Sequence, residues 1–205
     1  MAPSAQTTPA QVEMQTNAQL TDGRVRLRPC RPADAEAVYA AVRESMAELS
    51  TWTPWGQPGY SMSGCRQWLE SRADAWSAGR EFDFVILDAE DGAFLGGCGL
   101  NDINRTHNFA NLGYWVRTSR TGQGIATAVT RLVGRFGFEA LGFTRLEIVT
   151  AVGNRASQRV AKKAGATREG IERNRHVIGD TVHDVVMFSL IPADLKRNDS
   201  RTRDA

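Results

Sequence analysis

The sequence predicts an α/β protein with one mixed sheet flanked by helices, and three observations lead to this fold class. The 205 residues suffice for one domain with a sizeable core. Apolar residues follow strand spacing in some segments and helix spacing in others. The expected order is a strand, two helices, three antiparallel strands, a helix, a strand, a helix and two strands. A mixed sheet covered on both faces would bury the apolar side of every element.

Residues 24–78 are expected to contain a strand and two helices. Apolar residues alternate with arginines over residues 24–29, which is typical of a half-buried strand. Helical spacing follows from Ala35 to Leu49, and Pro32 suits the start of that helix. Residues 50–60 contain prolines and glycines and are expected to form a loop. A second helix is expected over residues 63–78.

The remaining elements follow in the same order along the chain. Residues 82–87 and 93–103 are expected to form a hairpin, and 110–116 a third antiparallel strand, because aromatic and branched residues favour strands. A long amphipathic stripe predicts a helix over residues 122–141. The rest of the sheet is expected from a strand at 144–152, a helix at 154–165 and two strands within 176–191 that are joined at Gly179 and Asp180.

Composition narrows the classes of function. A net charge of +2 argues against a protein that binds duplex nucleic acid, which would need a basic face. The cysteines at positions 30, 65 and 98 form no CxxC pair and are expected to be reduced and mostly buried.

We predict a flexible arm at 1–21, one domain at 22–193 and a charged tail at 194–205. With no signal peptide or membrane span, a cytoplasmic location is expected.

Two glycines stand immediately before the long helix. Gly122 and Gly124 would keep side chains away from the free N–H groups at a helix N-terminus, where phosphate can bind, and Arg120 lies just in front of them. The alternative is that they only form a turn. The segment contains no GxxxxGK[ST] pattern, and Thr127 stands where the dinucleotide fingerprint needs a third glycine.

The segment LGYWVRTSRTGQGIATAV, residues 112–129, resembles the acyl-CoA-binding motif of the GNAT superfamily of N-acetyltransferases. That motif is (Arg/Gln)-x-x-Gly-x-(Gly/Ala), and it falls on Thr121, Gly124 and Ala126. Thr121 departs from the expected Arg or Gln. Residues 118–170, with the N-x-x-S step at Asn154 to Ser157, and LSTWTPW at 49–55 are similar to the RimJ/RimL-type branch.

The resemblance implies the GNAT acyl-CoA N-acyltransferase fold and acetyl-CoA as cosubstrate, with no metal. In this family, the strand before the glycine loop carries a bulge and parts from the next strand. Backbone groups there would bind the pantetheine arm and polarise the thioester carbonyl. The implied cosubstrate residues are Trp115, Val116, Arg120, Thr121, Gly122, Gln123, Gly124, Ile125, Ala126, Thr127, Asn154 and Ser157.

The resemblance also suggests residues for catalysis and acceptor binding. Ser157 is the candidate acid for the leaving thiolate; alternatively, it only satisfies backbone amides at a helix start. His176 is the candidate base, because imidazole titrates in the useful range; alternatively, it is an ordinary strand histidine. Trp52 and Trp55 would shape the acceptor slot, or cap the core under a loop. Trp68 and Trp76 are expected in the core.

The function implied by the resemblance is acetyl transfer from acetyl-CoA to a primary amine. The N-terminal α-amine of a protein or peptide is preferred, as in RimJ and RimL. An α-amine, with a pKa near ~8, is also neutral far more often than a lysine amine. The alternatives are a small-molecule amine, such as an antibiotic or polyamine, a non-catalytic acyl-CoA sensor, and a nucleotide-phosphate binder. Membranes and nucleic acid are not expected partners, whereas a homodimer is compatible with the family.

Overall fold

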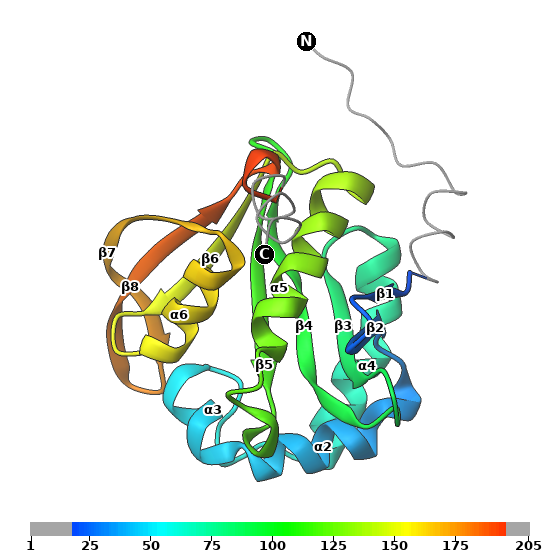
Figure 1. Cartoon of the computed structure of the whole chain (residues 1–205). Helices are drawn as coiled ribbons and strands as arrows, with labels where there is room; N and C mark the ends of the chain where they lie inside the picture. The colour runs from blue at the N-terminus through cyan, green and yellow to red at the C-terminus, as the bar shows by residue number, and fades with distance from the viewer. Residues whose placement is uncertain (1–17, 196–205) are drawn as a thin grey trace.

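The computed structural model describes residues 18–195, which form one eight-stranded sheet covered by helices (Figure 1). Residues 1–17 and 196–205, which hold most of the expected arm and tail, lie outside the described residues. Leu20 and Thr21, placed in the arm by the sequence, pair with the next strand as β1. The expected mixed α/β architecture is therefore confirmed.

The strands follow the order β1-β2-β3-β4-β5-β6-β8-β7 across the sheet. Every neighbouring pair is antiparallel except β5 and β6, which run parallel. The strands are β1 (Leu20–Thr21), β2 (Val25–Pro29), β3 (Phe82–Asp88), β4 (Phe94–Asn104), β5 (Phe109–Val116), β6 (Arg145–Ala151), β7 (Thr167–Ile178) and β8 (Thr181–Leu190).

The helices agree with the expected positions, with two differences. The first expected helix is divided at Ser45 into two, and the long helix ends in a π-helical turn. Local capping explains several ends: the Ser61 hydroxyl accepts from the Gly64 amide at 3.1 Å, and Gly165 ends its helix at φ 100°. The helices are α2 (Ala35–Glu44), α3 (Met46–Trp52), α4 (Met62–Ser77), α5 (Ile125–Arg135) and α6 (Arg155–Ala164), with short turns η1 (Pro32–Asp34), η2 (Thr118–Arg120) and η3 (Phe136–Ala140).

The two faces of the sheet bury separate apolar clusters. Phe84 and Ile86 of β3 point to the cluster beneath α5, whereas Val85 and Leu87 point to the cluster beneath α2 and α4. The second cluster reaches β5 only through Trp115. On the α2 and α4 face, the apolar cluster therefore does not cover β5 and β6, and cavities lie over these two strands.

The two tryptophans of α4 have different environments. Trp76 is buried, as expected, among Phe82, Phe84 and Phe136. The expectation for Trp68 is wrong, because 40% of the residue is exposed and the Arg72 guanidinium lies 4.8 Å from the centre of its ring. Helical spacing placed Trp68 on the apolar stripe, but that end of the stripe borders a cavity.

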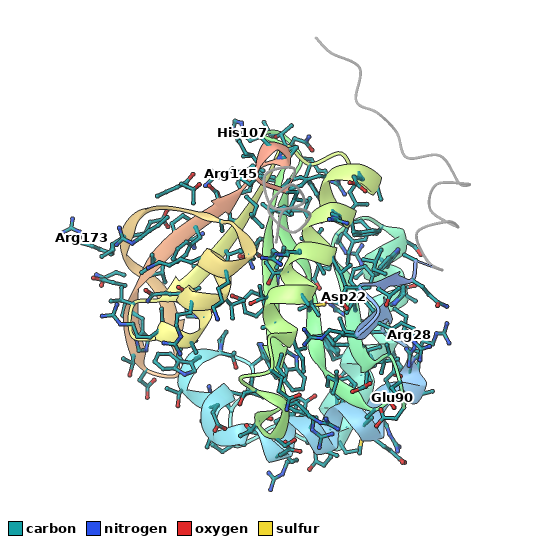
Figure 2. All side chains as sticks on the ribbon, viewed as in Figure 1. Asp22, Arg28, Glu90, His107, Arg145 and Arg173 are labelled. Carbon is teal, nitrogen blue, oxygen red and sulfur yellow. The ribbon has the colours of Figure 1, made fainter. Side chains whose placement is uncertain are left out.

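Charged side chains cover the rim of the molecule (Figure 2). Arg173 projects outward from β7, while His107 and Arg145 lie at the end of the sheet that holds the β4–β5 turn. Arg145 binds Glu147 at 2.9 Å and also Glu169, so Glu147 is a paired carboxylate. His107 is exposed in its turn.

Candidate functional site

The parallel strands β5 and β6 are paired over only three residues. Their register runs from Phe109 with Arg145 to Asn111 with Glu147. Beyond that point, β5 stays with β4 and β6 stays with β8. The Arg117 amide donates to the Leu95 carbonyl at 2.9 Å. Alternation along β5 therefore directs the N–H of Val116 into the gap between β5 and β6, and the N–H of Trp115 into the ladder with β4.

A β-bulge lies in β4 and not in the strand where the family pattern implied one. The register of β5 with β4 is unbroken from Asn111 to Val116, so the expected bulge is absent from that stretch. The irregularity falls between Asn101 and Asn104, and Asp102 has a left-handed backbone with φ 47°. Bulges re-aim side chains at sheet edges and active sites.

The loop before α5 presents a row of unpaired amides. Gly122 and Gly124 have φ of 77° and 80°, which glycine adopts without strain. Among the described residues, no hydrogen bond is formed by the N–H groups of residues 122–124. The first N–H groups of α5 also lack partners within the helix, and they lie at the positive end of its dipole. This geometry suits a diphosphate.

Two side chains support the glycine loop. Arg24 donates from Nη2 to the Gln123 carbonyl at 2.8 Å, although the two residues are 99 positions apart. The Thr121 hydroxyl donates to the Thr118 carbonyl at 2.9 Å. Thr121, which replaces the Arg or Gln of the motif, therefore bonds within its own loop.

A polar clasp joins the same loop to the first helices. The clasp consists of Glu44, Ser45 and Glu48. Glu44 accepts from Arg117 and from the Ser119 amide, and Arg117 lowers the pKa of Glu44 to about 2. Thr118 donates from its amide to the Ser45 hydroxyl oxygen and from its own hydroxyl to the Glu48 carboxylate, at 3.0 Å in each case. The segment that leads into the glycine loop is thus held at four points by α2, α3 and the residue between them.

Ser157 is held close to the gap by α6 and β5. Asn154 caps α6, and its Oδ1 accepts from the Ser157 amide at 3.0 Å. The Ser157 hydroxyl lies 3.1 Å from the Tyr114 hydroxyl, and either oxygen can donate. Asn154, and not the Ser157 hydroxyl, therefore satisfies the backbone amide. Burial raises the pKa of Tyr114 to about 12, so the phenol keeps its proton.

A cavity of about 820 Å³ lies on the α2 and α4 side of the sheet. Its floor contains Gly97, Gly99 and Gly113, where β4 and β5 carry no side chain. A Cβ atom on Gly99 would lie 2.6 Å from the Phe82 carbonyl oxygen, and one on Gly97 would lie 2.8 Å from the Trp115 indole nitrogen. Glycine at these two positions keeps the sheet backbone exposed to the cavity.

Aromatic side chains form one wall of this cavity. Trp52 at the end of α3 and Trp55 in the following loop both line it, together with Trp115 from β5. The Trp55 and Trp115 rings are 5.9 Å apart in an edge contact. Trp55 remains 44% exposed, so it closes the cavity and does not cap the core.

A half-buried carboxylate lies at the other wall. Asp83 of β3 borders the cavity next to Gly99 and accepts from Arg72 at 2.9 Å. Burial raises the pKa of Asp83, and the ion pair with Arg72 opposes part of that shift. The sequence offered only one signal for this residue, a single acid inside the apolar run FDFVIL.

His176 also lines the cavity, from β7. Burial lowers the pKa of His176, and the nearby His183 and Arg175 lower it further. A lowered pKa leaves the imidazole neutral at pH 7, which a proton acceptor requires. The structure thus brings together Trp52, Trp55, Trp115 and His176 around one cavity, whereas Ser157 and Asn154 reach it from the far side of the gap through Tyr114.

Comparison with known proteins agrees with this geometry. The family model "Acetyltransferase (GNAT) domain" matches residues 24–167, well over half of the chain. The chain belongs to the GNAT acetyltransferase family. The expected membership and N-acetyltransferase class are therefore confirmed, and the solved relatives show the same fold.

Several relatives of this GNAT enzyme are named as acetyltransferases of ribosomal proteins. It is 28% identical over 172 residues to YdaF of Bacillus subtilis (strain 168), provisionally named a ribosomal N-acetyltransferase, covering 82% of this chain and 91% of YdaF. A Vibrio cholerae structure, provisionally named a ribosomal-protein-serine acetyltransferase, is 29% identical to this chain and has a TM-score of 0.76. The match covers 86% of this chain and 99% of the Vibrio chain. The RimJ structure from Mycobacterium smegmatis, in complex with CoA-disulfide, has a TM-score of 0.78 at 24% identity and covers 91% and 94% of the two chains.

Two further sequence expectations can be compared with the structure. The three cysteines are free, with Cys65 and Cys98 buried and Cys30 partly buried. Within residues 18–195, no helix has the length and apolar character needed to cross a bilayer.

Proposed function

We propose that this enzyme acetylates the N-terminal α-amine of a protein or peptide, using acetyl-CoA. The single observation that carries the proposal is the gap between β5 and β6. The gap has the amide-lined loop at one end and adjoins the cavity that holds His176. The names of the relatives, which include ribosomal-protein acetyltransferases, support an α-amine acceptor.

The residues present fit the cosubstrate. The amides of Gly122 to Thr127 would hold the diphosphate, and the N–H of Val116 would donate to a carbonyl oxygen in the gap. Asn154 uses Oδ1 to cap α6, which leaves its Nδ2 group to donate to the pantetheine arm. When bound, acetyl-CoA supplies the acetyl group as an activated thioester. Placing one backbone donor at the developing oxyanion is worth roughly 2.7–4 kcal/mol in measured cases.

Ser157 and Tyr114 would act on the leaving group. A thiol has a pKa near ~8.5, so a hydroxyl hydrogen bond to the departing sulfur suffices. The phenol of Tyr114 stays protonated and donates to the Ser157 carbonyl at 3.2 Å, while its oxygen lies 3.1 Å from the Ser157 hydroxyl. These two contacts position the serine, whose hydrogen can turn from the phenol oxygen to the sulfur. Ser157 is the proposed acid, and Tyr114 orients it.

His176 would act on the amine. Only the neutral amine attacks, and its nitrogen must lose a proton as the amide forms. A neutral imidazole in the cavity can accept that proton, directly or through water. The tryptophan wall would then hold the first side chain of the peptide.

A small-molecule amine is the second candidate, and one observation favours it. The carboxylates of Glu81, Asp83 and Asp102 all border the cavity. Acidic groups beside aromatic rings are also suited to polyamines or aminoglycosides.

An acceptor screen separates these functions. Thiol release from acetyl-CoA would be followed with N-terminal peptides, N-blocked lysine peptides, spermidine and an aminoglycoside. We expect the free N-terminal peptides to have the highest kcat/KM. A higher value for spermidine or the aminoglycoside would contradict the peptide assignment. Tight acetyl-CoA binding without turnover of any amine would instead indicate a sensor.

The acid role is tested with Ser157→Ala. We expect kcat to fall about a hundredfold while the KM for acetyl-CoA changes little, since general acid catalysis contributes roughly 10²–10⁴. Ser77→Ala is the matched control, because Ser77 is exposed at the end of α4. An unchanged kcat in Ser157→Ala would remove the assignment.

A further inference from the structure

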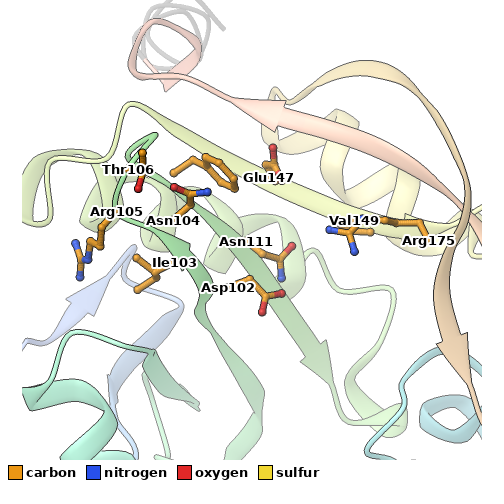
Figure 3. A pocket seen from close by; sticks show the side chains of 10 residues that line it. Asp102, Ile103, Asn104, Arg105, Thr106, Asn111, Glu147, Val149 and Arg175 are labelled. Carbon is orange, nitrogen blue, oxygen red and sulfur yellow. The ribbon is translucent and has the colours of Figure 1, made fainter.

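A second cavity of about 490 Å³ (Figure 3) adjoins the first on the same side of the sheet. Asp102 and Asn111 line both cavities, so the two cavities meet at these residues, and together they are called the groove. Leu146 and Ile148 of β6 are buried in the cluster beneath α5, which leaves the alternate residues of β6 on the groove side. The residues of the second cavity that the argument uses are Asp102, Arg105, Asn111, Glu147 and Arg175.

The bulge of β4 places Asp102 at the junction of the two cavities. Its backbone is left-handed, with φ 47°, a conformation that few residues other than glycine, asparagine and aspartate adopt. Among residues 18–195, nothing binds its carboxylate by a hydrogen bond or ion pair. The groove therefore contains an acidic group that the fold itself does not use.

Asn111 provides a second unused acceptor at the same place. Its Nδ2 donates to Asn101 Oδ1 at 2.7 Å, across β4 and β5. Its Oδ1 is buried and has no hydrogen-bond partner among the described residues. Buried polar atoms are seldom left unpaired, so this oxygen indicates that a donor from a ligand or solvent binds here.

Each of the other three charged groups of the second cavity makes a contact elsewhere, although the partner of Arg105 is a neutral carbonyl and Arg175 uses only its Nε atom. Glu147 binds Arg145 at 2.9 Å, and Arg175 binds Glu172 at 3.1 Å. Arg105 donates to the Gly79 carbonyl at 2.7 Å, and Figure 3 shows it turned away from Asp102 and Asn111. The uncommitted groups at the junction are thus two acceptors, one of them anionic. A ligand that matches them carries N–H donors and a positive charge.

We propose that the second cavity binds a basic side chain of the acceptor peptide, and that Asp102 determines this specificity. The inference rests on the proposed function, because the peptide's α-amine would lie in the first cavity beside His176. An extended peptide advances about 3.3–3.6 Å per residue, so a lysine or arginine at its second or third position can reach the adjoining cavity.

The test compares matched peptides on matched variants. The peptides share the best first residue from the acceptor screen and carry lysine, glutamine or glutamate at position two or three. Asp102→Asn removes the charge and keeps the size, and asparagine tolerates the left-handed backbone. Asp180→Asn is the control, because it makes the same change in the exposed β7–β8 turn, outside both cavities.

We expect the parent enzyme to prefer lysine over glutamine about tenfold in kcat/KM. Asp102→Asn should lose most of this preference, whereas Asp180→Asn should keep it. Equal rates for lysine and glutamine peptides in the parent, or an unchanged preference in Asp102→Asn, would overturn the subsite while leaving the proposed function intact.

Binding measurements keep the inference testable if no peptide is turned over. N-acetylated lysine and glutamine peptides would be titrated calorimetrically into the enzyme with CoA present. Tighter binding of the lysine peptide that is lost in Asp102→Asn supports the subsite, even if the acetylation of peptides fails. Equal affinities of the two peptides for the parent overturn it.

Discussion

Gly124→Ala tests whether the backbone of the glycine loop binds the cosubstrate. Gly124 has φ 80°, and a Cβ there would meet only Arg24 Nη2 at 3.9 Å, so the substitution strains the backbone without a steric clash. Holding alanine in this region costs roughly 1–2 kcal/mol. For a chain of this size, such a loss lowers Tm by about 2–8 °C.

Gly142→Ala is the matched control for that substitution. Gly142 has φ 71° with no atom within 4 Å of its Cβ position, and it lies beyond η3, at the other end of the long helix. The same backbone strain predicts a similar loss of stability, measured by urea unfolding, but no effect on the cosubstrate.

The expected effect on CoA binding follows from the amides. If the strained loop relaxes and one N–H no longer points at the diphosphate, the loss is roughly 1.5–3 kcal/mol, the value of a hydrogen bond to a charged group. The Kd for CoA should then rise about tenfold to a hundredfold in Gly124→Ala, as measured by calorimetry. An equal Kd in the parent, Gly124→Ala and Gly142→Ala would refute the assignment of the loop.

Three further predictions concern the acceptor cavity and two titrating groups. In Gly113→Ala the new Cβ meets no atom within 4 Å but enters the cavity, so the KM of the acceptor should rise while stability stays nearly unchanged. In Gly99→Ala the new Cβ would lie 2.6 Å from the Phe82 carbonyl oxygen, so the free energy of unfolding should fall by about 1–3 kcal/mol. If His176 is the base, kcat/KM for the acceptor should show a limb near pH ~8 from the α-amine itself and a second acid limb below pH 6.5, because the pKa of His176 is lowered. His176→Gln should remove only the lower limb, and an unchanged pH profile in that variant would exclude His176 as the base. The pKa of Glu44 falls from 4.5 to about 2 on folding, so its stabilisation is full above pH 4.5 and is lost as the pH falls toward 2. Urea unfolding should therefore show Glu44→Gln less stable than the parent at pH 7, with the difference shrinking below pH 4.5; a difference that stays constant down to pH 3 would contradict the clasp.

The sequence predicted the features of the site that depend on local backbone. Gly122 and Gly124 have the positive φ that a tight loop before a helix requires. The helix α6 begins within one residue of the predicted start, Asn154, although the capping role falls to Asn154 and not to Ser157, for which capping was the alternative. These features can be read from neighbouring residues, because the interactions that produce them span only a few positions.

The missed features depend on contacts between distant segments. Tyr114 and Ser157 are 43 positions apart, and Asp83 borders the cavity only because β3 lies beside β4. Ser45 interrupts an otherwise continuous helical pattern while its hydroxyl accepts from Thr118, 73 positions away. No local pattern distinguishes such residues from ordinary strand or helix residues.

The start of β7 was missed for a different reason. Most residues of Thr167–Ile178 are exposed on both faces, since this strand lies at the edge of the sheet. A strand with no buried face has no alternation of apolar and polar residues to detect. Its glutamates and arginines are the kind of side chains that protect an edge from pairing with other chains.

The clasp of Glu44, Ser45 and Glu48 has a consequence for the order of binding. The Thr118 hydroxyl donates to Glu48 of α3, and α3 ends at Trp52, so one short helix joins the glycine loop to the tryptophan wall of the first cavity. If acetyl-CoA orders the glycine loop, we expect this helix also to restrict Trp52 before the amine binds. Thermodynamic linkage makes this reciprocal, so each ligand should tighten the binding of the other. Steady-state kinetics should then show a ternary complex with positive cooperativity between the two ligands.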